Sequence, residues 1–197
     1  MGTREKAEKR RARALLTAAR TGLDAAARQA AALGVAERLS ALPLLAQART
    51  VAAYAPLGSE LDPRPALARL EARGVTILFP RSAPGHRRLA FCAAPPGGLV
   101  PGPLGALEPP ADAPEIPLSD LDAVLLPGLG FTPAGVRLGR GGGYYDETLR
   151  LAPRAHRIAL AFDLQLVDHL PSERHDLPMD AVVTEARALL FPRSHPT

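Results

Sequence analysis

One stretch in the second half of the chain constrains the fold more than any other. Residues 122–149 read DAVLLPGLGFTPAGVRLGRGGGYYDETL. The stretch begins with the apolar run 123–126 and passes through two turn-rich segments. It then reaches an arginine- and glycine-rich run, which leads into residues with helical propensity. A strand that feeds a glycine loop and then a helix start is typical of α/β folds.

The glycine run carries groups that suit a phosphate. Backbone N–H groups before a helix can point at an anion, and the helix dipole favours negative charge there. Arg137 and Arg140 add forked donors for phosphate oxygens, and Asp146 can hold a magnesium ion beside them. The run is neither a Walker A loop nor a G-x-G-x-x-G motif, and glycine loops also form plain turns. From the residues alone, a phosphate site and a plain turn both remain open.

Strands and helices alternate along the rest of the chain. We expect strands at 50–54, 75–79, 88–93, 121–126, 157–162 and 181–184, and helices at 5–19, 24–39, 62–72 and 144–149. Asp24 and Asp62 are the predicted N-caps, and the Pro- and Gly-rich residues 94–118 are predicted to be irregular. The alternation predicts an α/β, three-layer α/β/α sandwich with a mostly parallel, Rossmann-like sheet. A length of 197 residues suits a single domain over residues 1–197.

The basic character of the chain is confined to its beginning. The isoelectric point is near 9.8. Residues 1–20 hold seven Lys or Arg against two Glu, a net charge of +5, and the remaining chain carries −1. We therefore expect no nucleic-acid partner. The chain has no apolar run of ~18 residues and no apolar segment typical of a signal peptide, so we expect no membrane partner. Cys92, the only cysteine, predicts a buried inert thiol and a reducing, cytoplasmic location.

The first helix has a cationic face beside an apolar one. At about 100° per residue, one arc contains Lys6, Lys9, Arg10, Arg13 and Arg20. The adjoining apolar face, expected to pack, contains Ala12, Leu15, Leu16 and Ala19. The cationic face is either solvated or delivers cations to an anionic ligand.

Carboxylates elsewhere complete the candidate site. Glu60 lies in a strand-to-helix loop, and ligands of open α/β sheets bind at the carboxyl ends of strands. A second carboxylate near Asp146 would suit magnesium. Asp176 and Asp180 are both candidates, and spacing does not choose between them.

Taken together, these segments are similar to the 5-formyltetrahydrofolate cyclo-ligase (5,10-methenyltetrahydrofolate synthetase) family over nearly the whole chain. The most specific piece is PGLGFTPAGVRLGRGGGYYD at 127–146. The supporting pieces are the basic first helix and residues 54–62, 79–81, 105–109, 161–165 and 170–185.

The resemblance implies an enzyme that uses ATP and Mg²⁺ to convert 5-formyltetrahydrofolate to 5,10-methenyltetrahydrofolate, releasing ADP and phosphate. The formyl oxygen would attack the γ-phosphoryl group, and the second folate nitrogen would then close the ring as phosphate departs. Positioning and charge stabilisation would carry this catalysis without a covalent protein nucleophile. We expect a monomer.

The resemblance also implies roles for individual residues. The ATP-binding residues would be Lys9, Arg13, Arg137, Leu138, Gly139, Arg140, Gly141, Gly142, Gly143, Tyr144 and Tyr145. The folate-binding residues would be Ala55, Glu60, Arg140, Gly141, Gly142, Gly143 and Tyr144, with Arg140 and Tyr144 catalytic. Asp146 and Asp176 would hold the metal. A helix register that uses Lys6 and Arg10 competes with Lys9 and Arg13. Some relatives carry Lys at Gly142 and a larger residue at Ala55.

Two other functions remain open at this stage. A sugar-phosphate isomerase or CoA-transferase-like enzyme could use the same glycine loop without ATP or the cationic helix. An RNA-binding accessory protein could use the basic helix, although the chain has few aromatic residues for base stacking.

Overall fold

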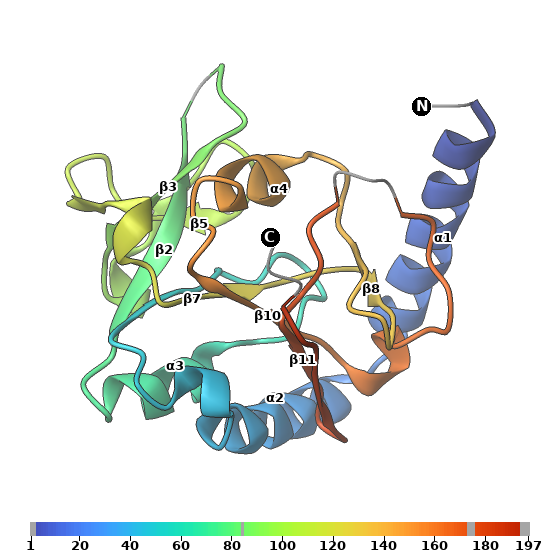
Figure 1. Ribbon diagram of the computed structural model, residues 1–197, viewed down its shortest axis with the longest axis horizontal. Coiled ribbons are helices and arrows are strands. Elements are labelled where there is room, and N and C mark those ends of the chain that lie inside the picture. The colour runs from blue at the N-terminus through green and yellow to red at the C-terminus, as the bar shows by residue number, and fades with distance from the viewer. Residues whose placement is uncertain (1–2, 84, 173–175, 194–197) are drawn as a thin grey trace.

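The protein is built on a central β-sheet. The computed structural model describes residues 3–83, 85–172 and 176–193. Within these ranges, eight strands form one sheet in the order β12-β11-β10-β7-β1-β2-β3-β6 (Figure 1). The strands are β1 (Thr50–Ala52), β2 (Thr76–Ser82), β3 (Leu89–Ala93), β6 (Glu115–Ile116), β7 (Ala123–Leu126), β10 (His156–Leu160), β11 (Ala181–Val183) and β12 (Ala188–Leu190). From β11 to β2 every neighbouring pair is parallel, whereas β12, β3 and β6 are antiparallel at the two edges.

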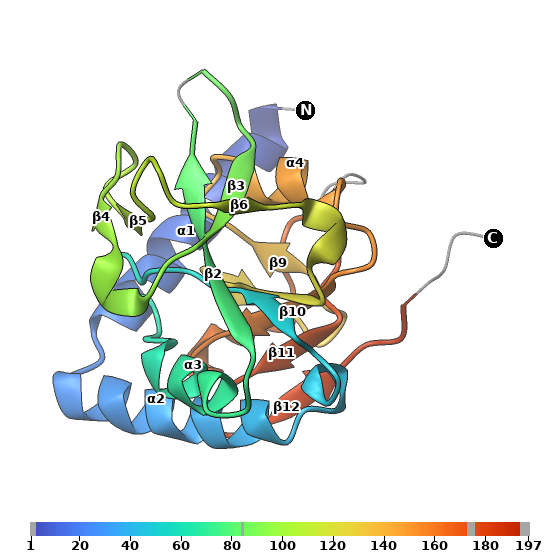
Figure 2. The same cartoon turned by 90° about the vertical axis from the view of Figure 1, so that its left-hand side faces the viewer.

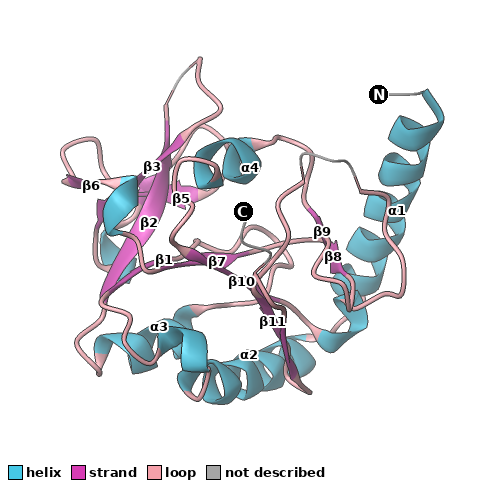
Figure 3. Cartoon of the chain, viewed as in Figure 1, coloured by secondary structure: helices cyan, strands magenta, loops and turns pink. Residues whose placement is uncertain are grey.

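Each face of the sheet has its own apolar core. Figures 1 and 2 show α2 (Ala25–Ser40) and α3 (Arg64–Glu71) together on one side of the sheet. Val51 packs in the core on that side, and its neighbour Ala52 packs in the opposite core. Strands buried on both faces read as continuous apolar runs, as Ala123–Leu126 does. The opposite face is covered by the six-residue helix α4 (Tyr144–Leu149) and by loops (Figure 3).

Helix α1 (Thr3–Thr21) stands beside the sheet rather than on either face (Figure 1). It packs against the two-stranded ribbon of β8 (Gly130–Phe131) and β9 (Arg137–Leu138). Leu16 contacts Leu129, Leu138 and Leu170 in a small apolar cluster. No helix in the described part of the chain is both long and apolar enough to cross a lipid bilayer.

The predicted fold class is confirmed, including the mostly parallel sheet. The predicted cap of α2 is also confirmed, because the Asp24 carboxylate accepts a 2.7 Å hydrogen bond from the Ala27 N–H. The predicted cap of α3 at Asp62 was wrong by one residue, because the helix begins at Arg64 with Pro63 at the cap position; the Arg64 N–H still donates to the Asp62 carboxylate.

The prediction of an irregular segment at 94–118 was incomplete. Within it, β4 (Val100–Pro101) pairs with β5 (Leu107–Glu108), and β6 joins the sheet edge. The edge strand β12 and the ribbon β8–β9 were also missed. Each missed strand has only two or three residues, which is too short to show a hydrophobic period of its own. Residues 173–175 of the predicted polar loop lie outside the described residues.

Asp180 anchors the amino ends of the parallel strands. Its side chain is buried, and its carboxylate accepts hydrogen bonds from the Arg157 N–H at 2.7 Å and from the Arg193 guanidinium at 2.9 and 3.0 Å. Burial alone would raise the pKa of Asp180, but the hydrogen bonds from Arg193 and Arg157 outweigh it and lower the pKa. Asp180 is therefore part of the scaffold, at the end of the sheet away from the glycine run.

We expect Asp180→Asn to lower the free energy of unfolding by about 3 kcal/mol at neutral pH, because two partly buried arginines lose the counter-charge of a buried carboxylate. A carboxyl group with a lowered pKa stabilises the fold above its unfolded pKa of about 3.9 and loses this effect as pH falls through the folded pKa. The difference between wild type and variant, measured by urea unfolding, should therefore shrink below about pH 4. A difference that stays constant at pH values well below about 4 would contradict this role.

Candidate active site

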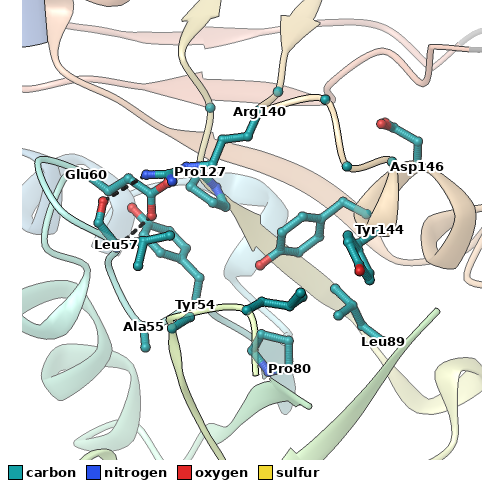
Figure 4. Close-up of a pocket in the computed structure, with 18 of the residues that line it drawn as sticks. Tyr54, Ala55, Leu57, Glu60, Pro80, Leu89, Pro127, Arg140, Tyr144 and Asp146 are labelled. Carbon is teal, nitrogen blue, oxygen red and sulfur yellow. Dashed lines mark hydrogen bonds and ion pairs between the residues drawn. The ribbon is translucent and has the colours of Figure 1, made fainter. Parts of the chain in front are cut away.

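A pocket of about 290 Å³ opens at the carboxyl ends of β1 and β7 (Figure 4). One wall is apolar, with Tyr54, Ala55, Leu57, Pro80 and Leu89 among its residues. The facing wall is the glycine run with its flanking polar residues, namely Arg137, Gly139, Arg140, Gly141, Gly142, Gly143, Tyr144, Tyr145 and Asp146. An apolar cavity with a few convergent polar groups is the usual form of a small-molecule site.

An ion pair between Arg140 and Glu60 joins the two walls (Figure 4). Arg140 Nε donates to Glu60 Oε1 at 3.0 Å, and Arg140 Nη2 donates to the Leu57 carbonyl at 3.0 Å. The other carboxylate oxygen, Oε2, accepts the Leu57 N–H at 2.9 Å. The Glu60 side chain is only 6% exposed, whereas that of Arg140 is 48% exposed. A buried carboxylate therefore orients a guanidinium that still faces solvent.

Arg137 is a buried side chain that holds the glycine run in place through its hydrogen bonds. Its side chain is 6% exposed, and Nη2 donates to Asp146 Oδ1 at 2.8 Å. Nη1 donates to the Pro127 carbonyl at 3.3 Å, and the guanidinium lies 5.8 Å from the centroid of the Tyr145 ring. Burial raises the pKa of Tyr145, so its hydroxyl stays neutral. These contacts tie the start of α4 to the end of β7.

The backbone of the glycine run uses conformations that other residues rarely adopt. Gly141 has φ +99° and Gly143 has φ +75°, and Gly143 occupies the cap position of α4. A side chain at Gly142 would place its Cβ 2.9 Å from the Tyr144 ring, so a larger residue there requires the ring to shift. Because α4 has only six residues, its dipole is short, and the guanidinium groups must supply most of the positive field.

Helix α1 brings two cations to the same region. Lys9 Nζ lies 3.2 Å from Asp176 Oδ2, and Arg13 Nε donates to the Gly139 carbonyl at 3.0 Å. Lys6 and Arg10, the competing pair, are exposed. A groove of about 610 Å³ runs along α1 and is lined by Arg13 and Arg140 among others. Arg140 thus lies between this groove and the apolar pocket.

The predicted packing face of α1 was wrong in part. Leu15 is 62% exposed and Ala19 is exposed, whereas Lys9 and Arg20 are buried together with Leu16. The helix packs against polar loops, so its cations, and not only its apolar residues, face the protein.

The predicted metal ligands each lie beside a cation. Asp146 pairs with Arg137, and Asp176 pairs with Lys9. Asp180, the alternative to Asp176, pairs with Arg193 at the opposite end of the sheet. Among the described residues, no group of three or more His, Cys, Asp or Glu side chains is arranged to hold a metal.

Four further residues shape the site: Tyr54, Pro127 and Gln165, which the sequence did not assign to it, and Arg20, which was expected only on the cationic face of the first helix. Tyr54 and Pro127 line the pocket, and the buried side chains of Arg20 and Gln165 both hydrogen-bond to the Gly128 carbonyl. The spacing of Lys9, Leu16 and Arg20 along one side of the helix was the available signal for Arg20. Cys92 is buried as predicted, and burial raises the pKa of its thiol.

The fold and the site together define an α/β enzyme of the class that binds small molecules at a glycine-rich loop. A sequence model described as the 5-formyltetrahydrofolate cyclo-ligase family matches residues 5–185. The chain therefore belongs to the 5-formyltetrahydrofolate cyclo-ligase family, as the resemblance indicated, and is an enzyme.

Individual relatives agree with this assignment. The 5-formyltetrahydrofolate cyclo-ligase of Mycolicibacterium smegmatis is 38% identical over 72% of this chain and 76% of its own length. The Escherichia coli K12 cyclo-ligase is 35% identical over 77% of this chain and 86% of its own. The NMR structure of the Aquifex aeolicus 5,10-methenyltetrahydrofolate synthetase superposes with a TM-score of 0.80 at 26% identity and covers 96% of each chain. A Mycoplasma pneumoniae synthetase at 20% identity shares the fold, with a TM-score of 0.74 over 90% of this chain and 99% of that one.

Proposed function

We propose that the protein converts 5-formyltetrahydrofolate to 5,10-methenyltetrahydrofolate with ATP and Mg²⁺, releasing ADP and phosphate. The observation that carries this proposal is the Arg140–Glu60 pair, which sits where an apolar pocket meets a glycine run rich in guanidinium groups. Such a site can hold a flat organic ring and a phosphate side by side. The related isomerase and transferase functions are not favoured, because the family match extends over residues 5–185.

The apolar pocket is the proposed folate site. Tyr54, Ala55 and Leu57 offer an apolar wall for the pterin ring system. The Glu60 carboxylate accepts two hydrogen bonds within the protein, from Arg140 and Leu57. A carboxylate has about four lone-pair sites, so it can also accept N–H groups of a pterin.

The proposed ATP site lies between α1 and the glycine run. Arg13 and Arg140 line the groove along α1, Lys9 lies one turn before Arg13 on the helix, and Arg137 lines the adjoining pocket. Several cations around one volume suit a triphosphate, since arginine can bind two phosphate oxygens at once. We prefer Lys9 and Arg13 to Lys6 and Arg10 because the latter two point to solvent.

Asp146 and Asp176 are the proposed holders of the magnesium ion. Magnesium is usually bound by one or two carboxylates together with water and substrate phosphates, so two acids beside a cationic loop fit this ion. When bound, magnesium would neutralise charge on the phosphate oxygens. Arg137 and Lys9 would hold the two carboxylates in place.

In the proposed reaction the formyl oxygen attacks the γ-phosphorus of ATP, and the bond to the ADP oxygen breaks. The second folate nitrogen then attacks the formyl carbon and loses its proton, and phosphate leaves with the former formyl oxygen. Arg140 would stabilise the charge that moves between these groups, and Tyr144 would hold the folate against the run. No protein nucleophile is needed, in keeping with a buried Cys92.

The direct test follows the methenyl product by absorbance after 5-formyltetrahydrofolate is added to purified protein. We expect product only when ATP and magnesium are both present, and none after chelation of the metal. Removal of residues 1–14 should abolish turnover, because it removes both proposed cations of α1. Product formation that is independent of ATP, or no product at all, would refute the proposed function.

For Arg140→Ala we expect turnover to fall by roughly 100- to 1,000-fold with the fold retained, because a preorganised charge beside the reacting groups is lost. Steady-state kinetics and circular dichroism would measure both effects. Arg69→Ala, at an exposed position of α3, is the matched control and should leave turnover unchanged. Normal turnover in a folded Arg140→Ala variant would exclude Arg140 from the mechanism.

For Glu60→Gln we expect weaker folate binding and nearly normal ATP binding, because the carboxylate faces the apolar pocket and three of the four proposed ATP cations are held by other residues. Calorimetric titration of each ligand separates the two effects. The control is Glu71→Gln, an exposed residue of α3. If the variant loses affinity for ATP instead of the folate, the proposed folate and ATP sites are assigned the wrong way round.

A further inference from the structure

Arg20 is the most deeply buried cation near the site, among the arginines and lysines whose side chains the structure describes. Its residue exposure is 2%, although it comes from α1, which stands outside the sheet. Nε donates to Ser59 Oγ at 3.1 Å, and Nη1 donates to the Gly128 carbonyl at 3.1 Å. One planar guanidinium therefore connects α1 to the loop after β1 and to the segment after β7.

Each of these two hydrogen bonds connects Arg20, through neighbouring residues, to the pocket. Ser59 immediately precedes Glu60, whose carboxylate holds Arg140. The Glu60 N–H donates to the Leu57 carbonyl at 3.3 Å, and the same carbonyl accepts Arg140 Nη2. Displacement of Ser59 would therefore move both acceptors that orient the Arg140 guanidinium.

The second contact fixes the floor of the pocket. The Gly128 carbonyl accepts from both Arg20 and Gln165, and the Leu129 carbonyl also accepts from Gln165. Pro127 and Gly128 line the pocket between these anchors. This segment has no regular secondary structure, so buried side chains supply the hydrogen bonds to its Gly128 and Leu129 carbonyls.

We infer that Arg20 is a positioning residue, which holds the Ser59–Glu60 loop against the β7 segment and thereby orients Arg140 for catalysis. This inference rests on the proposed function of Arg140. Burial lowers the pKa of Arg20 and the Glu60 carboxylate counteracts this effect, in keeping with a buried charge beside the ion pair. Arg20 also borders the groove along α1, but its guanidinium is held there by Ser59 and Gly128, so we assign it a positioning role without contact to the reacting atoms.

Arg20→Lys tests this role because it keeps the charge but loses the fork that reaches two acceptors. The first readout is hydrogen exchange of the Arg140 Nε–H in ligand-free, ¹⁵N-labelled protein, with its resonance assigned through Arg140→Lys. We expect exchange to become several-fold faster in Arg20→Lys and in the milder variant Ser59→Ala. Arg11→Lys, an exposed position on the same helix, is the control. Unchanged exchange in both test variants would overturn the inference, whether or not the proposed reaction is correct.

The second readout is a kinetic double-mutant cycle with Glu60→Gln. We expect Arg20→Lys to lower kcat/KM for the folate by roughly 10- to 100-fold, because small displacements of a catalytic group are costly. In the Glu60→Gln background the same change should have a much smaller effect, since Arg140 has already lost its anchor. Additive effects would mean that Arg20 acts only on the fold and would overturn the inference. An inactive wild type would refute the proposed reaction separately.

Discussion

The ion pair between Arg140 and Glu60 is the interaction on which the site depends. The two residues are 80 positions apart in the chain, and their loops meet because β1 and β7 are parallel neighbours with Val51 opposite Ala123. The register of these two strands therefore sets the distance between an apolar wall and a cationic loop. An open parallel sheet creates its ligand crevice in this way, at the carboxyl ends of its strands.

Charges at the site are balanced in pairs. Lys9 pairs with Asp176, Arg137 with Asp146, and Arg140 with Glu60. Each pair holds a flexible side chain in place. Two further cations, Arg13 and Arg20, hydrogen-bond to backbone carbonyls of the same region. These contacts leave the region with an excess of positive charge, as a phosphate ligand requires.

The sequence predicted the structure correctly where a local signal, such as an apolar run or a cap residue, determines it. Buried parallel strands such as residues 123–126 are continuous apolar runs, and Asp24 is a strong cap residue, so both were predicted correctly. The chemistry of the glycine run was also readable, since Arg137, Arg140 and Asp146 all line the pocket. The apolar wall could not be predicted from the sequence. Pro80 and Leu89 are brought to the pocket only by the order of strands β1, β2 and β3 in the sheet.

The part of the α1 packing face that was predicted wrongly has a physical cause that extends beyond this helix. Hydropathy assigns the buried face of a helix correctly when its partner is an apolar sheet. Here the partners are backbone carbonyls and hydroxyls at Gly128, Gly139 and Ser59, so guanidinium groups are the complementary residues. The basic isoelectric point therefore comes largely from a helix that directs several of its charges into the protein. A cluster of basic residues on one helix can thus indicate the wall of an active site as well as a surface for nucleic acids.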